Sequence, residues 1–422
     1  MEDPQRRPHD PAGTGTNRPR GAEHNEAVVL DAVRRGARTR VDLVEATGLV
    51  PQTISNISRR LLDAGLLREA GKERIAGHRK PRTLLELDPA GCYAVGVHVD
   101  PAAITFVLLD FTGRVVAESS RPTPPVRDPR SVTALLAARI GEIIAQSGVD
   151  PDRVLGVGVA TPGPVDTARG VVLDPPHLPG WQHVPLRESL RAATGRPVLL
   201  EKDVIACAVA EQWAGAGGAA HDFAFLYMAT GVGIGFVMDG AVVRGISGNA
   251  GDVGLLAVTA DEIGERFTGD FRAFWEVGSP RALVADAVAA GVLGGESAED
   301  GEDPARIGAR FGALCDAADA GDERAAGILD RAARYAASAV LTVTNLLDVD
   351  AVVLGGTMWE RAAARFLPIM APIVARVSST RRLHEIGIRG TALGEDVAAI
   401  GAGCLVLEDR FSARPPRLSP RG

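Results

Sequence analysis

Residues 93–119 read YAVGVHVDPAAITFVLLDFTGRVVAES, and this stretch decides the fold class of most of the chain. It contains three runs rich in β-branched and apolar residues, separated by short turn-forming segments. Such a pattern predicts an antiparallel meander. The runs are Tyr93–Val99, Ile104–Leu109 and Val115–Ser119. A helical pattern over Val132–Gln146 and an apolar strand over Val154–Val159 follow the meander, so the region is expected to be α/β.

The same order of elements returns in the second half of the chain. Three further runs predict another meander, and after helical segments an apolar strand is expected at Ala351–Leu354, followed by the turn Gly355–Gly356. The runs are Phe223–Ala229, Ile234–Met238 and Ala241–Arg244. This weak internal repeat predicts two similar lobes that face a cleft. A duplication of this kind describes structure and by itself implies no activity.

Residues 23–88 differ from this pattern and predict a small helical unit followed by a hairpin. A first helix is expected from near His24 to Gly36, and a second follows the candidate N-cap Thr39 and stops at Gly48. A third begins at Pro51, because proline favours the first helical position, and runs to about residue 64. Its buried stripe is Ile54, Ile57 and Leu61. Two short strands, Leu66–Ala70 and Thr83–Leu87, flank a basic loop.

The opposite face of the third helix is polar, and the hairpin carries several cations. This order of elements predicts a winged helix-turn-helix that binds double-stranded DNA: a helix, a short helix, a turn, a polar-faced helix and a basic hairpin. The alternative is a three-helix bundle whose polar face merely meets water. The candidate DNA-binding residues are Gln52, Thr53, Ser55, Asn56, Arg59, Arg60, Arg79, Lys80 and Arg82.

Charge is divided unevenly along the chain. The 422 residues carry 46 Lys and Arg against 53 Asp and Glu, a net charge of −7. Residues 1–82 hold 16 basic and 11 acidic residues, a net charge of +5, and the remaining 340 hold 30 and 42, a net charge of −12. A basic head on an acidic body favours one module that faces nucleic acid and another with a different task.

Composition excludes several other classes of protein. The four cysteines are far apart, so neither a disulfide framework nor a zinc site is indicated. No apolar run reaches the ~20 residues of a membrane span, and no signal peptide is apparent, so a cytoplasmic protein is expected. The tails, residues 1–22 and 411–422, lack apolar periodicity and are expected to be disordered.

Several motifs in order resemble the ROK family (repressors, open reading frames and sugar kinases), in its regulator branch. The resemblance covers about residues 24–408 and implies an actin/hexokinase-like, duplicated ribonuclease H-like body over residues 89–410. Lobe I would comprise about residues 89–200 with a C-terminal helix at about 396–408, and lobe II about 201–395. The motifs are the GLxxxTxSxxxxxLxxxGL pattern at 48–66, ATPGPVD at 160–166, LPGW at 178–181, VPL at 184–186, TGVGIG at 230–235 and VLGG at 353–356.

The resemblance also exposes a departure where family kinases bind ATP. Their first hairpin reads DxGGT, and its glycines let backbone N–H groups approach phosphate. Here His98 takes the position of the family Asp, and Asp100 and Pro101 take those of the glycines. Proline removes a donor and Asp100 adds a repelling charge, so a broken ATP site is expected. The later TGVGIG segment is intact, but it could equally be a simple tight turn.

The zinc site of family kinases is expected to be absent. Leu255 stands at the position of the family histidine, and residues 259–274, where the family has a cysteine cluster, hold neither Cys nor His. Because zinc orders a sugar-binding segment in those relatives, this part of the pocket is not expected to be built as it is in the kinases. No metal and no cofactor are predicted.

The resemblance implies five candidate ligand-binding residues: His177, Lys202, Asp203, Asp252 and Glu276. Asp203 retains the position of the family general base, and the preceding Asn is replaced by Lys202. Lys202 either forms a structural ion pair or contacts an acidic or phosphorylated ligand. Asp252 replaces a sugar-binding Glu, while Glu276 lies in a segment that aligns poorly. His177 stands for an Asn before LPGW, or is a surface histidine without a role.

Three functions remain in competition at this stage. The first is a transcription regulator, expected to be a repressor, that senses a sugar or related metabolite without phosphorylating it. It would act as a homodimer or homotetramer on an inverted-repeat operator. The second is an active sugar kinase with a DNA-binding appendage. The third is a DNA-binding dimer whose body takes no small ligand.

Overall fold

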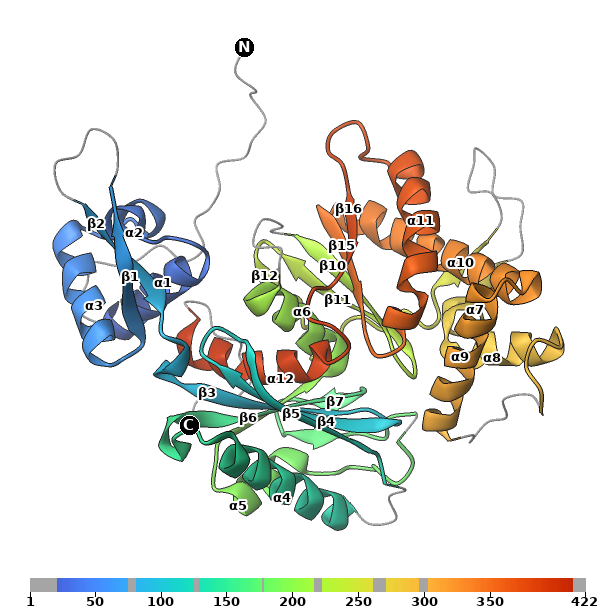
Figure 1. Cartoon of the computed structure of the whole chain (residues 1–422), viewed down its shortest axis with the longest axis horizontal. Coiled ribbons are helices and arrows are strands. Elements are labelled where there is room, and N and C mark those ends of the chain that lie inside the picture. The colour runs from blue at the N-terminus through green and yellow to red at the C-terminus, as the bar shows by residue number, and fades with distance from the viewer. Residues whose placement is uncertain are drawn as a thin grey trace.

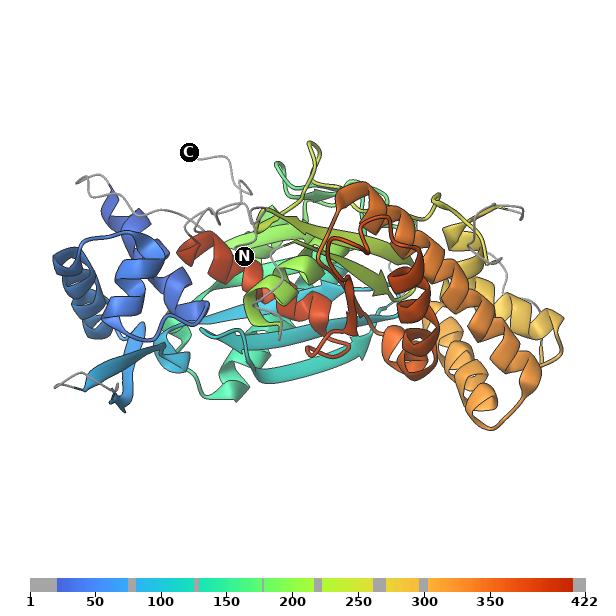
Figure 2. The ribbon, with the colours of Figure 1, turned by 90° about the horizontal axis from the view of Figure 1, so that it is seen from above.

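The structure is a computed structural model that describes residues 21–74, 81–124, 129–176, 178–215, 222–260, 271–295 and 303–412. A small helical head stands at one end of a body of two α/β lobes (Figure 1). Seen from above, the head again projects beyond the end of the body (Figure 2). The α/β class and the two-lobed organisation predicted from the repeat are confirmed.

The head has the predicted order of three helices and a hairpin. At the start of the second helix Thr39 accepts a hydrogen bond from the Asp42 N–H and the Asp42 carboxylate accepts one from the Thr39 N–H, a capping box that fixes the turn. Gly48, at φ 67°, ends this helix in the left-handed region. The elements are α1 Ala22–Arg34, α2 Arg40–Thr47, α3 Pro51–Asp63, β1 Leu67–Glu73 and β2 Arg82–Leu87.

The head joins the body without a linker. Strand β2 ends at Leu87, the 3-10 turn Pro89–Gly91 follows, and β3 of the body begins at Tyr93. The Arg153 guanidinium donates to the carbonyl of Ala90 at 2.7 Å and pins this turn to lobe I. The apolar core of the head is also continuous with that of the body. The head is therefore attached to lobe I through the chain and the Arg153 bond, and it shares an apolar core with residues of both lobes.

Lobe I is built on the five-stranded sheet that the quoted sequence begins. An antiparallel meander β5-β4-β3 is extended by two parallel strands, β6 and β9, in the order β5-β4-β3-β6-β9. The strands are β3 Tyr93–Val99, β4 Ala103–Asp110, β5 Val115–Pro122, β6 Val154–Thr161 and β9 Val198–Lys202. Helices α4 Pro129–Ser147 and α5 Leu186–Thr194 pack against this sheet and a two-stranded ribbon, β7 Val165–Asp166 with β8 Val171–Val172, completes the lobe.

Lobe II repeats this topology. Its sheet has the order β12-β11-β10-β15-β16, again an antiparallel meander followed by two parallel strands. The third strand is shorter than predicted and covers only two residues. The strands are β10 Phe223–Met228, β11 Val232–Met238, β12 Ala241–Val242, β15 Ala351–Gly355 and β16 Gly387–Gly390.

Two helices fill the space between the sheets. Helix α12 (Val397–Phe411) packs on β3 and β6 of lobe I, and α6 (Asp203–Ala214) packs on β10 and β11 of lobe II (Figure 1). The two helices also pack tightly on each other. A Cβ added at Gly401 of α12 would lie 1.9 Å from the carbonyl oxygen of Ala206 in α6, so only glycine permits this approach.

The remaining helices and strands belong to lobe II. The long helix α10 lies against α8, α9 and α11, and together they form the helical end of the molecule opposite the head (Figure 1). The remaining elements of lobe II are β13 Ala257–Val258, β14 Arg272–Ala273, α7 Phe274–Gly278, α8 Pro280–Ala289, α9 Pro304–Asp319, α10 Glu323–Leu347 and α11 Trp359–Val377. In lobe I, a 3-10 turn, Pro151–Arg153, precedes β6. Among the described residues, no helix combines the length and apolar character needed to cross a membrane.

Candidate functional site

A pocket of about 730 Å³ lies where the two lobes meet. This volume is within the range of small-molecule sites. Lobe I contributes the β3–β4 turn, the segment after β6 and the end of β9, and lobe II contributes the β10–β11 turn and the loop before β13. Three of the predicted ligand-binding residues line it: Lys202, Asp203 and Asp252.

Lys202 and Asp203 stand at the junction of β9 and α6, on the wall of the pocket. Lys202 is the N-cap of α6, and its ammonium group donates to the backbone carbonyls of Asn249 and Ala250, both at 3.4 Å. The Asp203 carboxylate accepts the N–H of Val204 at 2.7 Å. Burial raises the pKa of Asp203 to about 7, against the lowering effect of the Lys202 charge. Asp203 can therefore accept a proton near neutral pH.

The turn of the first hairpin is bonded to the turn of the second across the cleft. The buried Asp100 carboxylate accepts hydrogen bonds from the Ala102 N–H at 2.8 Å and from the Thr230 hydroxyl at 3.1 Å. Burial raises the pKa of Asp100 from 3.8 to about 6. Asp100 thus takes up the space between the two hairpins and places a carboxyl group where a phosphate-binding turn would need backbone donors.

His98 lies behind this turn and does not line the pocket. It is fully buried, its ring is 6.2 Å from that of Tyr227, and among the described residues its Nε2 has no hydrogen-bond partner. Burial lowers the pKa of His98 to about 4, so the imidazole is neutral at physiological pH. His98 therefore cannot act as the carboxylate that the kinase motif DxGGT has at this position.

Asn249 ties the two lobes together beside the pocket. Its side-chain amide donates to the carbonyl of Val165 at 2.8 Å and accepts the N–H of Val165 at 2.7 Å. A second tie lies deeper, where Arg244 forms ion pairs with Glu201 of β9 at 2.7 Å and with Glu408 of α12 at 3.1 Å. These contacts join segments that lobe motion would separate.

The other predicted ligand residues lie at the pocket mouth or away from it. Asp252 is exposed and accepts the Gly254 N–H at 3.1 Å, and the exposed Leu255 lines the pocket beside it. Glu276 in α7 is ion-paired with Arg272 at 3.3 Å and does not line the pocket, whereas its neighbour Trp275 does. His177 lies outside the described residues. Within the described ranges, no three His, Cys, Asp or Glu side chains gather as a metal-binding group.

Helix α3 presents a polar face, as predicted. Ile54, Ile57 and Leu61 are buried against the head core. Gln52 and Asn56 are exposed one turn apart, and the Gln52 amide donates to the Asn56 side-chain oxygen at 3.2 Å. Side chains of this kind can hydrogen-bond base edges in a major groove. The exposed positions among the candidates are Gln52, Asn56, Arg59 and Arg60, and the partly buried ones are Thr53, Ser55 and Arg82.

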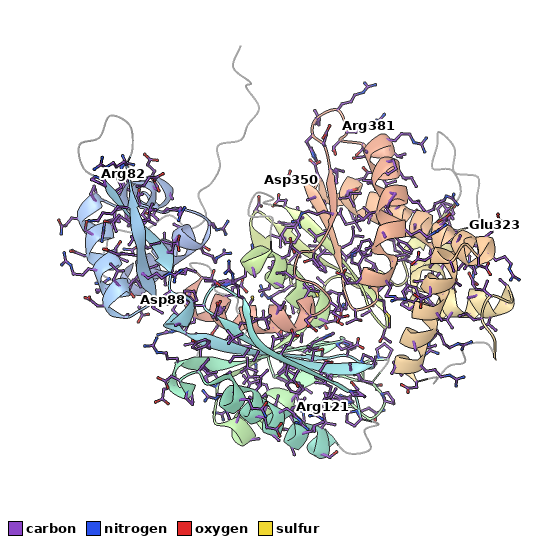
Figure 3. The ribbon with its side chains drawn as sticks, in the orientation of Figure 1. Arg82, Asp88, Arg121, Glu323, Asp350 and Arg381 are labelled. Atoms are coloured by element: carbon purple, nitrogen blue, oxygen red, sulfur yellow. The ribbon has the colours of Figure 1, made fainter. Side chains whose placement is uncertain are left out.

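Two features qualify the set of candidate DNA-binding residues. Arg60 is ion-paired with Glu26 of α1 at 2.8 Å, so its charge is partly engaged within the head. Arg82 lies at the far end of the hairpin from the body, whereas Asp88 marks the junction with the body (Figure 3). Arg79 and Lys80 of the predicted wing lie outside the described residues.

The head touches the body at the far end of α6. Arg34 of α1 donates to the carbonyls of Gln212 and Trp213, at 2.8 and 3.2 Å, and its guanidinium carbon lies 4.7 Å from the centroid of the Trp213 ring. Asp31 holds Arg34 by an ion pair at 2.7 Å. The last carbonyls of a helix lack partners within the helix and attract a cation. Arg34 therefore caps the helix whose other end forms the pocket wall.

Sequence reasoning missed the contacts that join distant segments. Arg34, Asn249 and Arg281 were not predicted as functional residues, although Asn249 bridges the lobes and Arg281 lines the pocket. No local motif marks such residues, because their partners lie far along the chain. For the contact between the two hairpins the sequence did hold one signal, the replacement of a family glycine by Asp100. The hydrogen bond from Thr230 to Asp100 now explains this replacement.

Comparison with known proteins gives a consistent result. The model of the ROK family matches residues 94–409. The xylose repressor of Caldicellulosiruptor bescii is 29% identical over 216 residues, about half of each chain. The DNA-binding transcriptional dual regulator NagC of Escherichia coli is 24% identical over 90% of this chain and 92% of its own. The glucokinase of Halalkalibacterium halodurans is 26% identical over 75% of this chain and 96% of its own.

Solved structures show the same fold. A ROK family transcriptional regulator, a homologue of the E. coli MLC protein, superposes with a TM-score of 0.71 over 93% of this chain and 97% of its own, at 23% identity. The ROK hexokinase of Thermus thermophilus reaches a TM-score of 0.58 at 28% identity, over 74% of this chain and 97% of its own.

Proposed function

Because this chain belongs to the ROK family, we propose that it is a DNA-binding transcriptional repressor whose cleft senses a sugar or a related metabolite. The alignment with NagC covers 90% of the chain, so it extends beyond the body into the head. The alignment with the glucokinase covers 75%, the share that the body alone occupies. A regulator of this kind acts where the DNA is, in the cytoplasm.

The first hairpin argues against phosphoryl transfer. A phosphate cradle needs backbone N–H groups that point at the phosphate oxygens, and an unscreened carboxylate in their place repels the phosphate. Pro101 has no N–H to offer, and Asp100 brings a carboxyl group that is already bonded to Thr230 of the opposite hairpin. This bond across the cleft is the observation that carries the proposal. We expect the pocket to bind its ligand without phosphorylating it.

The head supplies the DNA-binding part of the proposal. Helix α3 would enter the major groove with Gln52, Asn56 and Arg59. The end of the hairpin that carries Arg82 would reach phosphates or the neighbouring minor groove. A single small module of this kind binds weakly. We therefore expect a dimer on an inverted-repeat operator.

Helix α6 offers a direct route from the pocket to the head. It has 12 residues and so spans about 18 Å, from Asp203 in the pocket to the carbonyls that Arg34 caps. Its C-terminal end is tied to lobe II, because Gln212 donates to the carbonyl of Gly240 at 2.6 Å and Glu211 pairs with Arg389 at 2.7 Å. The head is tied to lobe I. A ligand that changes the lobe angle would therefore change the contact between Arg34 and α6.

Binding to the DNA upstream of its own gene tests the DNA-binding role. We expect the full-length protein to shift this DNA, with an affinity that falls steeply as salt rises. The double variant N56A/R59A should weaken binding at least about thirtyfold, since two base-edge contacts are worth ~1–3 kcal/mol each. The variant R376A, an exposed arginine of α11, is the matched control and should bind as the wild type does.

Three outcomes of these experiments would separate the competing functions. Binding that is unchanged in N56A/R59A would contradict the DNA-binding role of α3. ATP turnover with any sugar would instead support an active kinase and overturn the interpretation of the Asp100 turn. DNA binding that no sugar, sugar acid or sugar phosphate alters would favour a DNA-binding dimer without a ligand.

A further inference from the structure

The ammonium group of Lys202 lies in the pocket with an incomplete set of partners. Lys202 is only 9% exposed, and an ammonium group has three N–H donors. Its hydrogen bonds go to two backbone carbonyls at 3.4 Å, which is longer than is usual for an N–H donor and a carbonyl oxygen. Among the residues that the structure describes, no carboxylate forms an ion pair with Lys202. A charge buried to this degree is costly unless it is paired.

The neighbouring turn holds Lys202 in this position. A Cβ added at Gly163 would lie 3.2 Å from Cε of Lys202, so the backbone of the Gly163–Pro164 turn packs directly on the lysine stem. The aliphatic part of the Lys202 side chain thus packs on lobe I, while its ammonium group reaches the carbonyls of Asn249 and Ala250 in lobe II. The charge is fixed at the pocket wall instead of extending into solvent.

The acidic groups of the pocket are bonded elsewhere. The carboxylate of Asp100 accepts from Ala102 and Thr230, that of Asp203 from the Val204 N–H, and that of Asp252 from the Gly254 N–H. Each keeps lone pairs that can accept hydroxyl protons, and although the Lys202 charge lowers the pKa of Asp203, none of the three carboxylates lies within ion-pair distance of Lys202. Arg281 of α8 brings a second cation to the lining.

We propose that the effector is a polyhydroxylated molecule that carries an acidic group, either a carboxylate or a phosphate, and that Lys202 is the counter-charge of that group. The inference rests on the proposed sensing function and names the chemical class of its ligand. The anion would complete the hydrogen bonding of the ammonium, and the carboxylates would accept hydroxyl protons of the same molecule. A neutral sugar would leave Lys202 as it is.

Calorimetric titration of the full-length protein tests this inference. The probes are D-glucose and D-xylose as neutral sugars, D-gluconate and D-glucuronate as acids, and D-glucose 6-phosphate, with inorganic phosphate and acetate as plain anions. We expect at least one acidic probe to bind ten- to a hundredfold more tightly than the neutral sugars, and more tightly than the plain anions. The preference should fall as ionic strength rises.

Two variants separate the role of Lys202 from a structural one. K202N, which restores the family residue, should lose the preference for the acidic probe by at least about tenfold while the affinity for neutral sugars stays the same. K72N, an exposed lysine of β1, is the matched control and should keep the preference. If K202N unfolds, K202R should retain the preference in a folded protein.

The outcomes also distinguish this inference from the function on which it rests. Neutral sugars that bind as tightly as the acidic probes, an acid preference that survives in K202N, or no binding by any acidic probe at millimolar concentration would overturn the inference. If a neutral sugar binds and alters DNA affinity while the acids do not, the regulatory function stands and the inference alone fails.

Discussion

Asp100 occupies the first turn of the lobe I sheet, where the family pattern has glycine, and bonds across the cleft to Thr230. Burial raises its pKa from 3.8 to about 6. The native state therefore binds this proton more tightly than the unfolded chain does. Keeping the charged form buried costs stability at every pH above about 6, a cost that disappears as the pH falls toward 4.

The variant D100N should be more stable than the wild type at neutral and alkaline pH. Asparagine keeps the oxygen that accepts from Ala102 and Thr230 but carries no charge to bury. The raised pKa corresponds to a gain of up to about 3 kcal/mol at about pH 8, shrinking to nothing near pH 4. Denaturant unfolding at several pH values measures this difference.

The exposed Asp152 supplies the control, because D152N should leave the pH profile of the wild type unchanged. A D100N protein that is less stable than the wild type at pH values above 6 would show that the negative charge itself holds the two hairpins together. The charge of Asp100 also helps to raise the pKa of Asp203. D100N should therefore lower the pKa of Asp203.

At the scale of single residues, the sequence predicted which residues line the pocket better than it predicted their hydrogen-bond partners. Lys202, Asp203 and Asp252 were singled out by comparison with family motifs, and all three line one pocket. The bond from Asp100 to Thr230 joins residues 130 positions apart, and no local pattern could reveal it. Glu276 was placed by a weak alignment; it is ion-paired with Arg272 and does not line the pocket.

Helix α6 connects three parts of the molecule. It begins at the pocket, packs against α12 along its length, and ends under Arg34 of the head. A displacement at one end of a rigid helix is transmitted to the other end, but it changes DNA affinity only if ligand binds the two lobe arrangements unequally. The contact of Arg34 with the C-terminal carbonyls is the place where such a displacement meets the head.

The variant R34A should uncouple the two sites. It removes both hydrogen bonds to α6 and the stacking on Trp213, while α3 and the pocket keep their own contacts. Allosteric coupling is typically 5- to 150-fold in affinity, and we expect the ligand effect on DNA binding to fall to about twofold or less. DNA titrations with and without saturating effector measure the effect, using whichever acidic or neutral probe binds.

Arg35 provides a matched control for this experiment. It pairs with the same carboxylate, Asp31, at 2.9 Å, and among the described residues no hydrogen bond or ion pair joins its side chain to α6. R35A should keep the full ligand effect, and both variants should bind the effector as the wild type does. An R34A protein in which the ligand still changes DNA affinity by the wild-type factor would show that the signal passes along another path.

The sequence predicted the two meanders and the strands β6 and β15, but it missed the parallel strands β9 and β16 and the helix α6. The meanders are marked by turn residues between short apolar runs, so their strands begin and end close to the predicted positions. Helix α6 reads DVIACAVAEQWA and is apolar on nearly every side, because it is buried between α12 and β11. Such a helix has no polar face and therefore no 3.6-residue pattern to detect.

The division of charge takes on a structural meaning at the scale of the whole molecule. The segment 1–82, with its net positive charge, includes the whole of α3 and reaches the first residue of β2. The acidic remainder contains the rest of β2 and the whole body. Phosphates attract the head and are repelled by the body, which favours approach of the DNA from the side of α3. Figure 3 places Arg82 at the end of the hairpin that lies farthest from the body.

If two such heads act together, the spacing of the operator half-sites must match the distance between them. Insertion of about five base pairs between the half-sites turns one half-site by half a helical turn, to the opposite face of the DNA. The second head then cannot bind, and the affinity should fall about a hundredfold, toward that of one head. Titration of the native and lengthened operators measures this loss, and a central substitution of equal length is the control. Equal affinity for both operators would show that each head binds independently of the other.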